Sequence, residues 1–423
     1  MPAAYDADGS VQAETQYARR MALDLERLRA ETPGCAGRIH LNNAGAALMP
    51  ALVLETMTDY LRAEAELGGY ETAAARRNEI EDFYTATAQL LGCEPRNVAF
   101  APSATEAYAR ALSSVPLERG DIILTTRDDY ISNQIAFISL RKRFGVEVVH
   151  APNVEEGGVD VDALARLMRE RRPRIVAVTH VPTNSGLVQP VAEIGARCRE
   201  LDLLYLVDAC QSAGQCALDV DEIGCDFLSA TSRKFLRGPR GGGFLYVSDR
   251  ALGAGYEPLF VDMRGARWTG FEEYEPVETA ARFEDWEFSY ATVVGAGAAI
   301  WYALRVGLDA IAERATTLGA RLREALANLD GVRVLDRGRE LCAIVTVAFD
   351  GLASDELHDE LERRGINSSV SERQHARYDF TDKGVEWALR LSPHYYNTEA
   401  ELDEVVAAIG ELTARDRRAL HVS

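Results

Sequence analysis

Short apolar runs alternate with amphipathic segments from about residue 97 to residue 232, and this alternation limits the fold more than any other feature of the sequence. The runs are flanked by turn residues and are nearly all apolar, as strands buried on both faces require. Strands separated by helices imply crossover connections and a mostly parallel sheet with helices on both faces. The predicted strands are 97–103, 121–126, 146–152, 174–181, 203–209 and 227–232, and the predicted helices are 104–115, 132–144, 160–172 and 190–202. The sequence therefore predicts an α/β fold.

The pattern of predicted helices and strands changes after about residue 305. A long predicted helix at 310–329 is followed by strands at 332–336, 343–350 and 387–393 and by helices at 354–365 and 398–416. Thr398 and Glu401 have the spacing of a capping box at the start of the last helix. We expect three parts, which are an N-terminal arm and helix (1–40), a large domain (41–304) and a smaller α+β domain (305–423).

Charge and composition exclude several classes of partner. The 423 residues include 66 acidic and 46 basic side chains, a formal net charge of -20, which argues against a nucleic acid or an anionic membrane as the main partner. The N-terminus has no signal-peptide pattern, and the apolar segment 290–304 is too short to span a bilayer, so we expect a buried helix there. The seven cysteines show no C-x-x-C spacing, so neither a disulfide framework nor a metal site is expected. These features favour a cytoplasmic protein.

One loop is basic although the chain as a whole is acidic. The stretch "TSRKFLRGPRGGG" (231–243) carries Arg233, Lys234, Arg237 and Arg240 and precedes a strand that we expect to begin near Phe244. Its glycines let the backbone turn tightly where side chains would crowd a ligand. A basic loop in an acidic protein is best explained by one small anion. The sequence leaves open whether Arg237 and Arg240 serve a cofactor, a substrate or the fold.

Polar side chains follow several predicted strands at the point where each strand ends. Ligands of parallel sheets bind beyond the carboxyl ends of the strands, so we expect these side chains to share one rim. They are Ser103, Ala104 and Thr105 after one strand, His180, Thr183 and Asn184 after another, Asp208 and Gln211 after a third, and Thr231 and Lys234 after a fourth.

Pyridoxal phosphate (PLP) is a cofactor that needs an amine, a carboxylate and an anion site together. Its aldehyde forms a Schiff base with a lysine, and its pyridine nitrogen withdraws electrons only while protonated, so Lys234 and Asp208 suit these two roles. The phosphate requires N–H groups at a helix start, hydroxyls and a cation, which the start of the helix at 104–115, Thr231 and Arg233 offer. We also expect Arg233 to lower the pKa of the neighbouring Lys234.

These residues resemble the class V aminotransferases of fold-type I, a family that includes cysteine desulfurases and selenocysteine lyases. The resemblance covers nearly the whole chain through ordered motifs, which are "LNNAGAALMP", "SATEA", "DYISN", "THVPTNSGLVQP", "VDACQSAG", "SRKFLRGPRG" and "RLSPHYYNT". It implies a sheet of the seven-stranded type and a homodimer. It also implies a catalytic Lys234, and cofactor contacts from Ser103, Ala104, Thr105, Tyr130, Thr183, Asn184, Asp208, Gln211, Thr231 and Arg233. Substrate contacts are expected from Asn43, Arg390, Trp286 and Arg240, with Arg390 binding the α-carboxylate.

The chain departs from the family pattern in four places. Arg233 stands where the family often has histidine, and either Ile131 or Tyr130 takes the place of a histidine that stacks on the cofactor. Related enzymes have a Gly-Thr pair at the position of Trp286 and the residue after it, and that threonine binds the phosphate. Trp286 therefore has another role, either as a wall of the substrate pocket or in packing at a dimer interface. The segment 363–380 lacks the nucleophilic cysteine of desulfurases, and the nearest one, Cys342, is expected in a strand. Because persulfide chemistry needs an exposed thiolate, we do not expect a desulfurase.

Lys234 can remove an α-proton without a thiol, so β-elimination is the reaction that the resemblance favours. We expect a PLP-dependent C–S lyase that converts an S-substituted cysteine or its sulfoxide into a thiol or sulfenate, pyruvate and ammonia. The form of the lysine loop is similar to that of hercynylcysteine sulfoxide lyases and isopenicillin-epimerase-like enzymes, which suggests low-molecular-weight-thiol or antibiotic metabolism. Transamination, epimerisation and decarboxylative deamination remain alternatives, and a cofactor-free scaffold would not need Lys234, Asp208 and Arg390 together.

Overall fold

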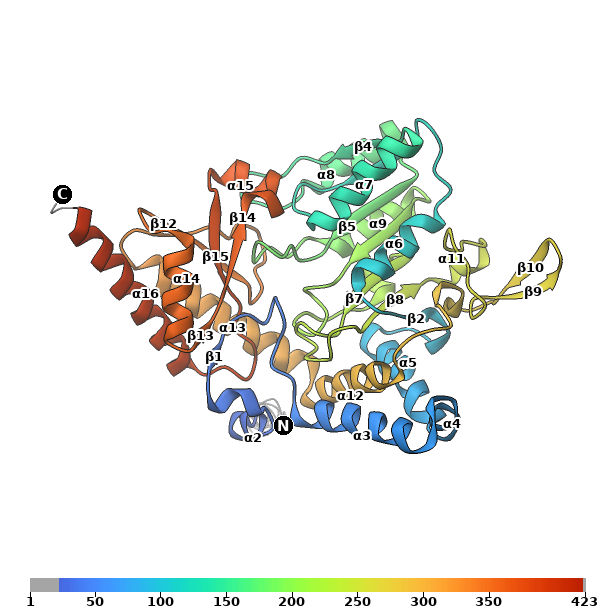
Figure 1. The fold of residues 1–423 in the computed structure, drawn as a ribbon. Helices are drawn as coiled ribbons and strands as arrows, with labels where there is room; N and C mark the ends of the chain where they lie inside the picture. The colour runs from blue at the N-terminus through green and yellow to red at the C-terminus, as the bar shows by residue number, and fades with distance from the viewer. Residues whose placement is uncertain (1–22, 421–423) are drawn as a thin grey trace, which may run out of the picture.

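A central sheet of seven strands organises most of the chain, as seen in the computed structural model, which describes residues 23–420 (Figure 1). The strand order is β2-β8-β7-β6-β5-β3-β4, and only β8 runs antiparallel to its neighbours. The strands are β2 (Val98–Ala101), β3 (Ile122–Thr125), β4 (Glu147–His150), β5 (Ile175–Thr179), β6 (Leu204–Asp208), β7 (Phe227–Thr231) and β8 (Gly243–Val247). The predicted α/β fold and mostly parallel sheet are confirmed.

Helices cover both faces of this sheet because successive strand residues point to opposite sides. Val176 and Val178 of β5 belong to one apolar cluster, with residues of α5, α8, α9 and α12, whereas Ile175 and Ala177 belong to another, with residues of α6 and α7. The helices are α5 (Arg77–Leu91), α6 (Ala104–Ser114), α7 (Ile131–Phe144), α8 (Val161–Arg171), α9 (Val191–Glu200) and α12 (Tyr290–Val306). The prediction of a buried helix at 290–304 is confirmed by α12.

The C-terminal part is built around a second, antiparallel sheet with the order β11-β12-β15-β14. Its strands are β11 (Val332–Val334), β12 (Val345–Phe349), β14 (Ser369–Glu372) and β15 (Trp387–Leu391), and α13 (Leu308–Ala327), α14 (Ser354–Arg363) and α16 (Glu399–Leu420) contribute to its core. The capping box is confirmed, since Glu401 N–H donates to Thr398 Oγ1 over 3.1 Å and Thr398 N–H to Glu401 Oε2 over 3.0 Å.

The N-terminal segment that precedes the large sheet also contacts the C-terminal part. Strand β1 (Ile39–His40) pairs in parallel with β13 (Ile366–Asn367), while the first helix described is α2 (Leu25–Ala30). Most of the predicted N-terminal arm, residues 1–22, lies outside the described residues. The expected boundaries at 40 and 304 stay predictions.

One feature of the fold was not expected from the sequence. A hairpin of β9 (Ala266–Gly270) and β10 (Glu273–Pro276) extends away from the body of the molecule (Figure 1). Its residues are half or fully exposed and follow no buried pattern. The remaining helices are α3 (Ala51–Leu67), α4 (Gly69–Ala75), α10 (Val220–Ile223), α11 (Asp249–Gly253) and α15 (Arg377–Lys383).

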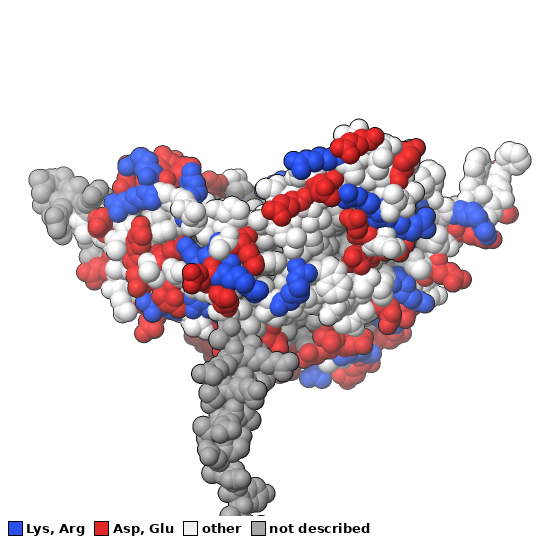
Figure 2. Space-filling model, turned by 90° about the horizontal axis from the view of Figure 1, so that it is seen from below, with Lys and Arg blue, Asp and Glu red and all other residues white. Residues whose placement is uncertain are grey.

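The surface is mixed in charge. On the face shown in Figure 2, acidic and basic side chains are interspersed and form no continuous basic area. Within residues 23–420 no single helix is long and apolar enough to cross a membrane, and α12 and α13 pass that test only as a pair bent by 82°.

Candidate active site

Lys234 lies in the tight turn that follows β7 and is 6% exposed. Arg237 N–H donates to the Lys234 carbonyl over 2.9 Å, which closes the turn and directs the lysine side chain inward. The ammonium lies 5.9 Å from the ring centre of Tyr130. Neither a hydrogen bond nor an ion pair holds Lys234 Nζ among the side chains that the structure describes. A buried amine without a partner is unfavourable unless a ligand completes its surroundings.

Burial is the largest influence on this amine, and it lowers the pKa of Lys234 below its ordinary value. Arg233 and Arg390 lower the pKa further, while Cys210 and Asp208 act in the opposite direction. The predicted direction is confirmed, but the pKa of Lys234 is lowered mainly by desolvation, and the effect of Arg233 is smaller than the opposing effects of Cys210 and Asp208. The result is an amine that loses its proton more easily than a surface lysine does.

Asp208 stands at the end of β6 and is 4% exposed. Its Oδ1 accepts from the Cys210 N–H over 2.9 Å, and its Oδ2 accepts from Asn133 Nδ2 over 3.0 Å. Asn133 also donates to Oδ1 of Asp129 over 3.1 Å, and burial raises the pKa of Asp129 to about 6. Sequence reasoning missed Asn133, although it closes the "DYISN" motif. These contacts fix the orientation of the Asp208 carboxylate.

Arg390 in β15 points from the C-terminal sheet toward the rim and is 7% exposed. It donates to Thr183 Oγ1 over 2.8 Å and to Asn42 Oδ1 over 3.1 Å, while its Nε has no partner. Gln211 Nε2 also donates to Thr183 Oγ1, over 2.8 Å, and its Oε1 has no partner. Burial lowers the pKa of Arg390 to about 10, with Arg233 adding to the effect. A buried guanidinium that meets no carboxylate is suited to bind an anion.

The expected phosphate region gathers around the first residue of β8. Gly243 pairs with Ala101 of β2 on one side and Thr231 of β7 on the other. A Cβ at Gly243 would lie 2.9 Å from the Ser103 carbonyl carbon and 3.0 Å from the Ala104 nitrogen, so glycine is required for this close approach. The first N–H groups of α6, those of Ala104 and exposed Thr105, have no partner within the helix by position.

Hydrogen bonds hold the two hydroxyls and one of the two cations of this region. Ser103 Oγ caps α6 by accepting from the Glu106 N–H over 3.1 Å, and Thr231 Oγ1 donates to the Gly242 carbonyl over 3.2 Å. Arg233 donates to the Gly45 carbonyl, and exposed Arg240 lies close enough to lower the pKa of Arg233. Two neighbouring cations beside a free helix start form a suitable anion site.

The structure separates other predicted residues from this set. Asn184 Nδ2 donates to Asp379 over 2.7 Å, toward α15. Asn43 is fully buried, and its amide donates to the carbonyls of Ser392 and His40, so Asn42 rather than Asn43 approaches Arg390. Trp286 is 43% exposed in the loop before α12, where its N–H donates to Asp262.

The geometry also bears on two questions that the sequence left open, namely whether Tyr130 or Ile131 faces the lysine and whether a cysteine is available as a nucleophile. Tyr130 is the aromatic residue that faces Lys234, whereas Ile131 begins α7 and lines the cavity between α7 and segment 374–381. Cys342 lies just before β12 and is 2% exposed, with burial raising its pKa to about 12. Cys210, the cysteine nearest Lys234, also has its pKa raised to about 12, by burial and by Asp208.

Arg237 serves the fold. It is 1% exposed and donates to the Leu48 carbonyl over 2.9 Å and to Tyr395 and Thr32 hydroxyls over 2.5 Å each. Its guanidinium carbon also lies 4.5 Å from the ring centre of Tyr396. The arginine thus joins the lysine loop to the N-terminal and C-terminal segments.

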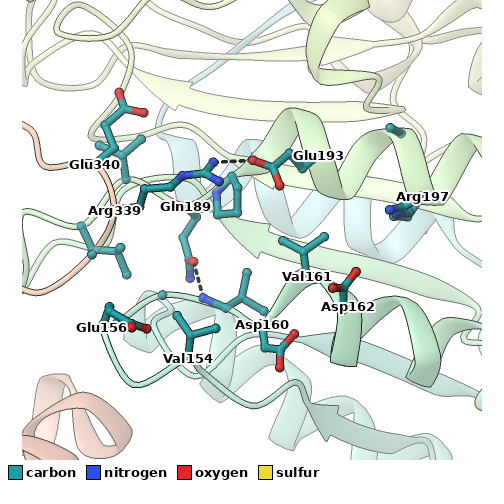
Figure 3. Close-up of a pocket in the computed structure, with 18 residues that line it drawn as sticks. Val154, Glu156, Asp160, Val161, Asp162, Gln189, Glu193, Arg197, Arg339 and Glu340 are labelled. Carbon is teal, nitrogen blue, oxygen red and sulfur yellow. Dashed lines mark hydrogen bonds and ion pairs between the residues drawn. The ribbon is translucent and has the colours of Figure 1, made fainter.

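Two cavities of similar size flank the rim. One, of about 830 Å³, lies between the loop after β4, the start of α9 and segment 338–340, and contains no predicted site residue (Figure 3). The other, of about 810 Å³, lies between α7 and segment 374–381 and includes Asp129 and Asn184. Only the second adjoins the set around Lys234.

Comparison with known proteins identifies the family, because residues 39–405 match aminotransferase class V. The chain belongs to this family. It is 30% identical over 400 residues to a probable hercynylcysteine sulfoxide lyase of Mycobacterium tuberculosis, covering 92% of this chain and 93% of that protein. It is 26% identical over 397 residues to a probable cysteine desulfurase of Methanothermobacter thermautotrophicus, covering 92% and 98%. A cysteine desulfurase from Thermococcus onnurineus has the same fold (TM-score 0.85, 24% identity, 93% and 98% covered).

This class V family uses PLP, so the chain is a PLP-dependent enzyme. The residues present fit that cofactor. Lys234 offers a buried amine without a partner, Asp208 an oriented carboxylate, and Arg390 and Gln211 each a buried polar atom that nothing in the protein satisfies. The role of each residue in binding stays a prediction.

Proposed function

We propose that this enzyme is a C–S lyase that cleaves an S-substituted cysteine, or its sulfoxide, by β-elimination. The observation that carries the proposal is the absence of a suitable thiol. Segment 363–380 contains no cysteine, and burial raises the pKa of Cys210, the thiol nearest Lys234, to about 12. A sulfur acceptor must be a thiolate, so transfer of sulfur to the enzyme is disfavoured. The 30% identity to a probable hercynylcysteine sulfoxide lyase supports the same reaction class.

The residues around Lys234 suit the proton transfer that elimination requires. PLP, when bound, withdraws electrons from the α-carbon of an attached amino acid. Asp208 would hold a proton on the ring nitrogen, since Asn133 and the Cys210 N–H fix its carboxylate. Arg390 would bind the α-carboxylate and so orient the substrate. Lys234, with its lowered pKa, would then remove the α-proton as a general base.

The bond that breaks joins the β-carbon to sulfur. The electron pair from the α C–H bond forms the new carbon–carbon double bond, and the sulfur leaves with the electrons of the C–S bond as a thiolate or sulfenate. The remaining three-carbon unit takes up water to give pyruvate and ammonia. No external oxidant or reductant is needed for this balance.

Pyruvate release tests the proposed reaction. The protein loaded with PLP is incubated with S-methylcysteine, its sulfoxide and larger S-alkyl cysteines, and pyruvate is measured with lactate dehydrogenase. We expect equal amounts of pyruvate and released sulfur compound, with no pyruvate from Lys234→Ala. A keto acid that retains the sulfur would indicate transamination instead. Failure of every S-substituted cysteine to yield pyruvate would overturn the proposal.

We also propose that the enzyme is a homodimer. The hairpin and its flanks expose a group of large apolar side chains, Leu259, Phe260, Met263, Trp268 and Phe271, with Phe271 100% exposed. Contiguous exposed apolar residues usually mark an interface, and two-fold dimers are the commonest assembly. Sedimentation should give a species of twice the 46.4 kDa chain mass, and a monomer at micromolar concentration would contradict this. A cytoplasmic location and a role in thiol or antibiotic metabolism stay predictions.

A further inference from the structure

The cavity between α7 and segment 374–381 is lined by direct neighbours of the residues around Lys234. Asp129 precedes Tyr130, the ring that faces Lys234, and Asn184 follows Thr183; both Asp129 and Asn184 line the cavity. Asp129 accepts from Asn133, the residue that orients the catalytic-site carboxylate, and Asn184 follows Thr183, which Arg390 binds. A group attached to a substrate at Lys234 therefore has this cavity as its nearest large space.

One wall of the cavity is apolar and has no protein partner. Ile131, Ile135 and Ile138 follow helical spacing and lie on one face of α7, next to Val148 of β4. Ile135 is 58% exposed and Ile138 48% exposed, although both are large apolar side chains. Covering them with an apolar ligand would remove this surface from water, which favours binding.

Flat rings also line the cavity. Tyr378 of α15 is 38% exposed, and its ring centre lies 4.6 Å from that of His150. Burial lowers the pKa of His150, so this imidazole is neutral near pH 7. The guanidinium of Arg127 lies 5.0 Å from the ring centre of Tyr378. Flat, polarisable surfaces of this kind pack well against an aromatic ring.

Two of the three arginines that line the cavity have no ion-pair partner among the described side chains. Arg127 forms an ion pair with Asp382 over 2.8 Å, and Asp379 forms one with Lys383 over 2.7 Å. Arg141 also lines the cavity, and its guanidinium forms no ion pair or hydrogen bond with the residues described.

Arg377 has the same character. It is exposed, lines the cavity and has no ion-pair partner among the side chains of residues 23–414. Asp129 also lines the cavity without an ion pair, but it is only 7% exposed and its carboxylate accepts from the Tyr130 N–H and from Gln134 Nε2, each over 2.7 Å. A ligand that reaches the open side therefore meets two free guanidinium groups, which prefer a carboxylate or a similar anion.

We propose that this cavity binds the S-substituent of the substrate, and that this substituent has a flat apolar body ending in an anionic group. This inference rests on the proposed C–S lyase function. It identifies the substrate class as bulky, acidic conjugates of cysteine rather than simple S-alkyl cysteines. Tyr378 and the isoleucines of α7 would contact the ring, and Arg141 and Arg377 the anion.

Three substrates separate these contributions. S-methylcysteine has no ring, S-benzylcysteine adds the ring, and S-(4-carboxybenzyl)cysteine adds the anion. We expect kcat/KM to rise on the order of 10²-fold from methyl to benzyl. The carboxylate should add roughly five-fold, as one exposed ion pair does.

Two variants and a matched control assign the effects to residues. Tyr378→Ala should lower the benzyl-to-methyl ratio of kcat/KM, and Arg141→Gln should lower the carboxybenzyl-to-benzyl ratio to about one. Arg143→Gln is the control, since Arg143 lies in the same turn of α7 but does not line the cavity. Circular dichroism confirms that each variant is folded.

A binding measurement makes the inference independent of turnover. The compound 3-(4-carboxybenzylthio)propanoate lacks the amino group and cannot react, so its Kd for the PLP-loaded protein reports binding without turnover, and the change in Kd between variants reports the cavity residue that was replaced. We expect Arg141→Gln to weaken it roughly five-fold and Arg143→Gln to leave it unchanged. Equal Kd values for wild type and Arg141→Gln would overturn the inference. Efficient pyruvate release from S-methylcysteine with no preference for the aryl conjugates would do the same while leaving the lyase function intact.

Discussion

Two buried cations lie three positions apart in the same loop, and they differ in what surrounds them. Arg237 has a protein acceptor for each of its donor nitrogens and three tyrosine rings around its guanidinium. Lys234 is almost as buried, yet its ammonium has only the ring of Tyr130 nearby. A satisfied buried charge stabilises the fold, whereas an unsatisfied one is kept for a ligand.

This difference also shows how the four cations of the loop at 231–243 divide between the fold and the site. Of its four cations, Arg237 belongs to the fold, and Lys234 and Arg233 face the rim at the strand ends. Arg240 is exposed beside Arg233. The following predictions test this division between residues that hold the fold and residues that carry the chemistry.

The largest effect is expected for Lys234→Ala. Loss of the general base should lower kcat/KM by roughly 10⁴-fold. The apo variant should be as stable as wild type or more so, because an unpartnered buried amine contributes no stability. Turnover assays and urea denaturation without PLP measure the two quantities. If Lys234→Ala kept a tenth of the wild-type kcat/KM, Lys234 would not be the general base, and the proposed difference in role between Lys234 and Arg237 would be wrong.

Arg237→Met should, in contrast, lower the stability of the protein. It leaves the Leu48 carbonyl and two buried hydroxyls without a donor, and we expect a loss of about 3–5 kcal/mol of unfolding free energy. Arg240→Met, an exposed neighbour, is the matched control and should cost less than about 0.5 kcal/mol. If both variants unfold at the wild-type urea concentration, Arg237 does not hold the loop.

Arg390 extends the comparison to a third buried cation. Its Nε has no partner, as Lys234 Nζ has none, so we expect Arg390→Ala to act on substrate binding. KM for an S-substituted cysteine should rise roughly 10²-fold through loss of a buried ion pair. The matched substrate is S-methylcysteamine, which lacks the carboxylate and should be affected little. An unchanged KM for the amino acid would refute the proposed contact.

The smallest effect is expected for Gly243→Ala. The new Cβ would lie 2.7 Å from the Ala230 carbonyl oxygen and 3.0 Å from the Ala104 nitrogen, which forces the start of α6 away from β8. We expect a cost of about 1–3 kcal/mol and a weaker affinity for PLP. Gly253→Ala is the control, because its Cβ would meet nothing within 4 Å. Fluorescence titration with PLP should show no change for the control, and a Gly243 variant that binds as tightly would show that the phosphate is held elsewhere.

The sequence predicted most of the large sheet because its strands are buried on both faces and therefore read as continuous apolar runs. The β9–β10 hairpin was missed for the opposite reason, since its residues are exposed and carry no burial pattern. The antiparallel direction of β8 also could not be read from its residues. Direction depends on the length of the preceding turn, which brings Gly243 beside Thr231.

The candidate site was predictable where it depends on strand ends, because parallel strands bring their carboxyl ends to one edge. Asn133 was missed since only the packing of α7 against β6 places it on Asp208. The choice between Asn42 and Asn43 depends on a single bridge, that of Asn42 to Ser392, which turns one side chain to Arg390 and the other into the core. Pairing between distant segments of this kind leaves no local signal.

The central claim, that Lys234 is the amine that takes the cofactor, has a direct test. The chain contains only three lysines, of which Lys142 lies on the surface and Lys383 is paired with Asp379, so each gives a distinct peptide. The PLP-loaded protein is reduced with borohydride, which fixes the cofactor on its amine, then digested and sequenced by mass spectrometry. The account predicts stoichiometric modification of Lys234 alone. Modification of Lys383 or Lys142 in its place, or an unmodified Lys234 in a protein that binds PLP, would contradict it.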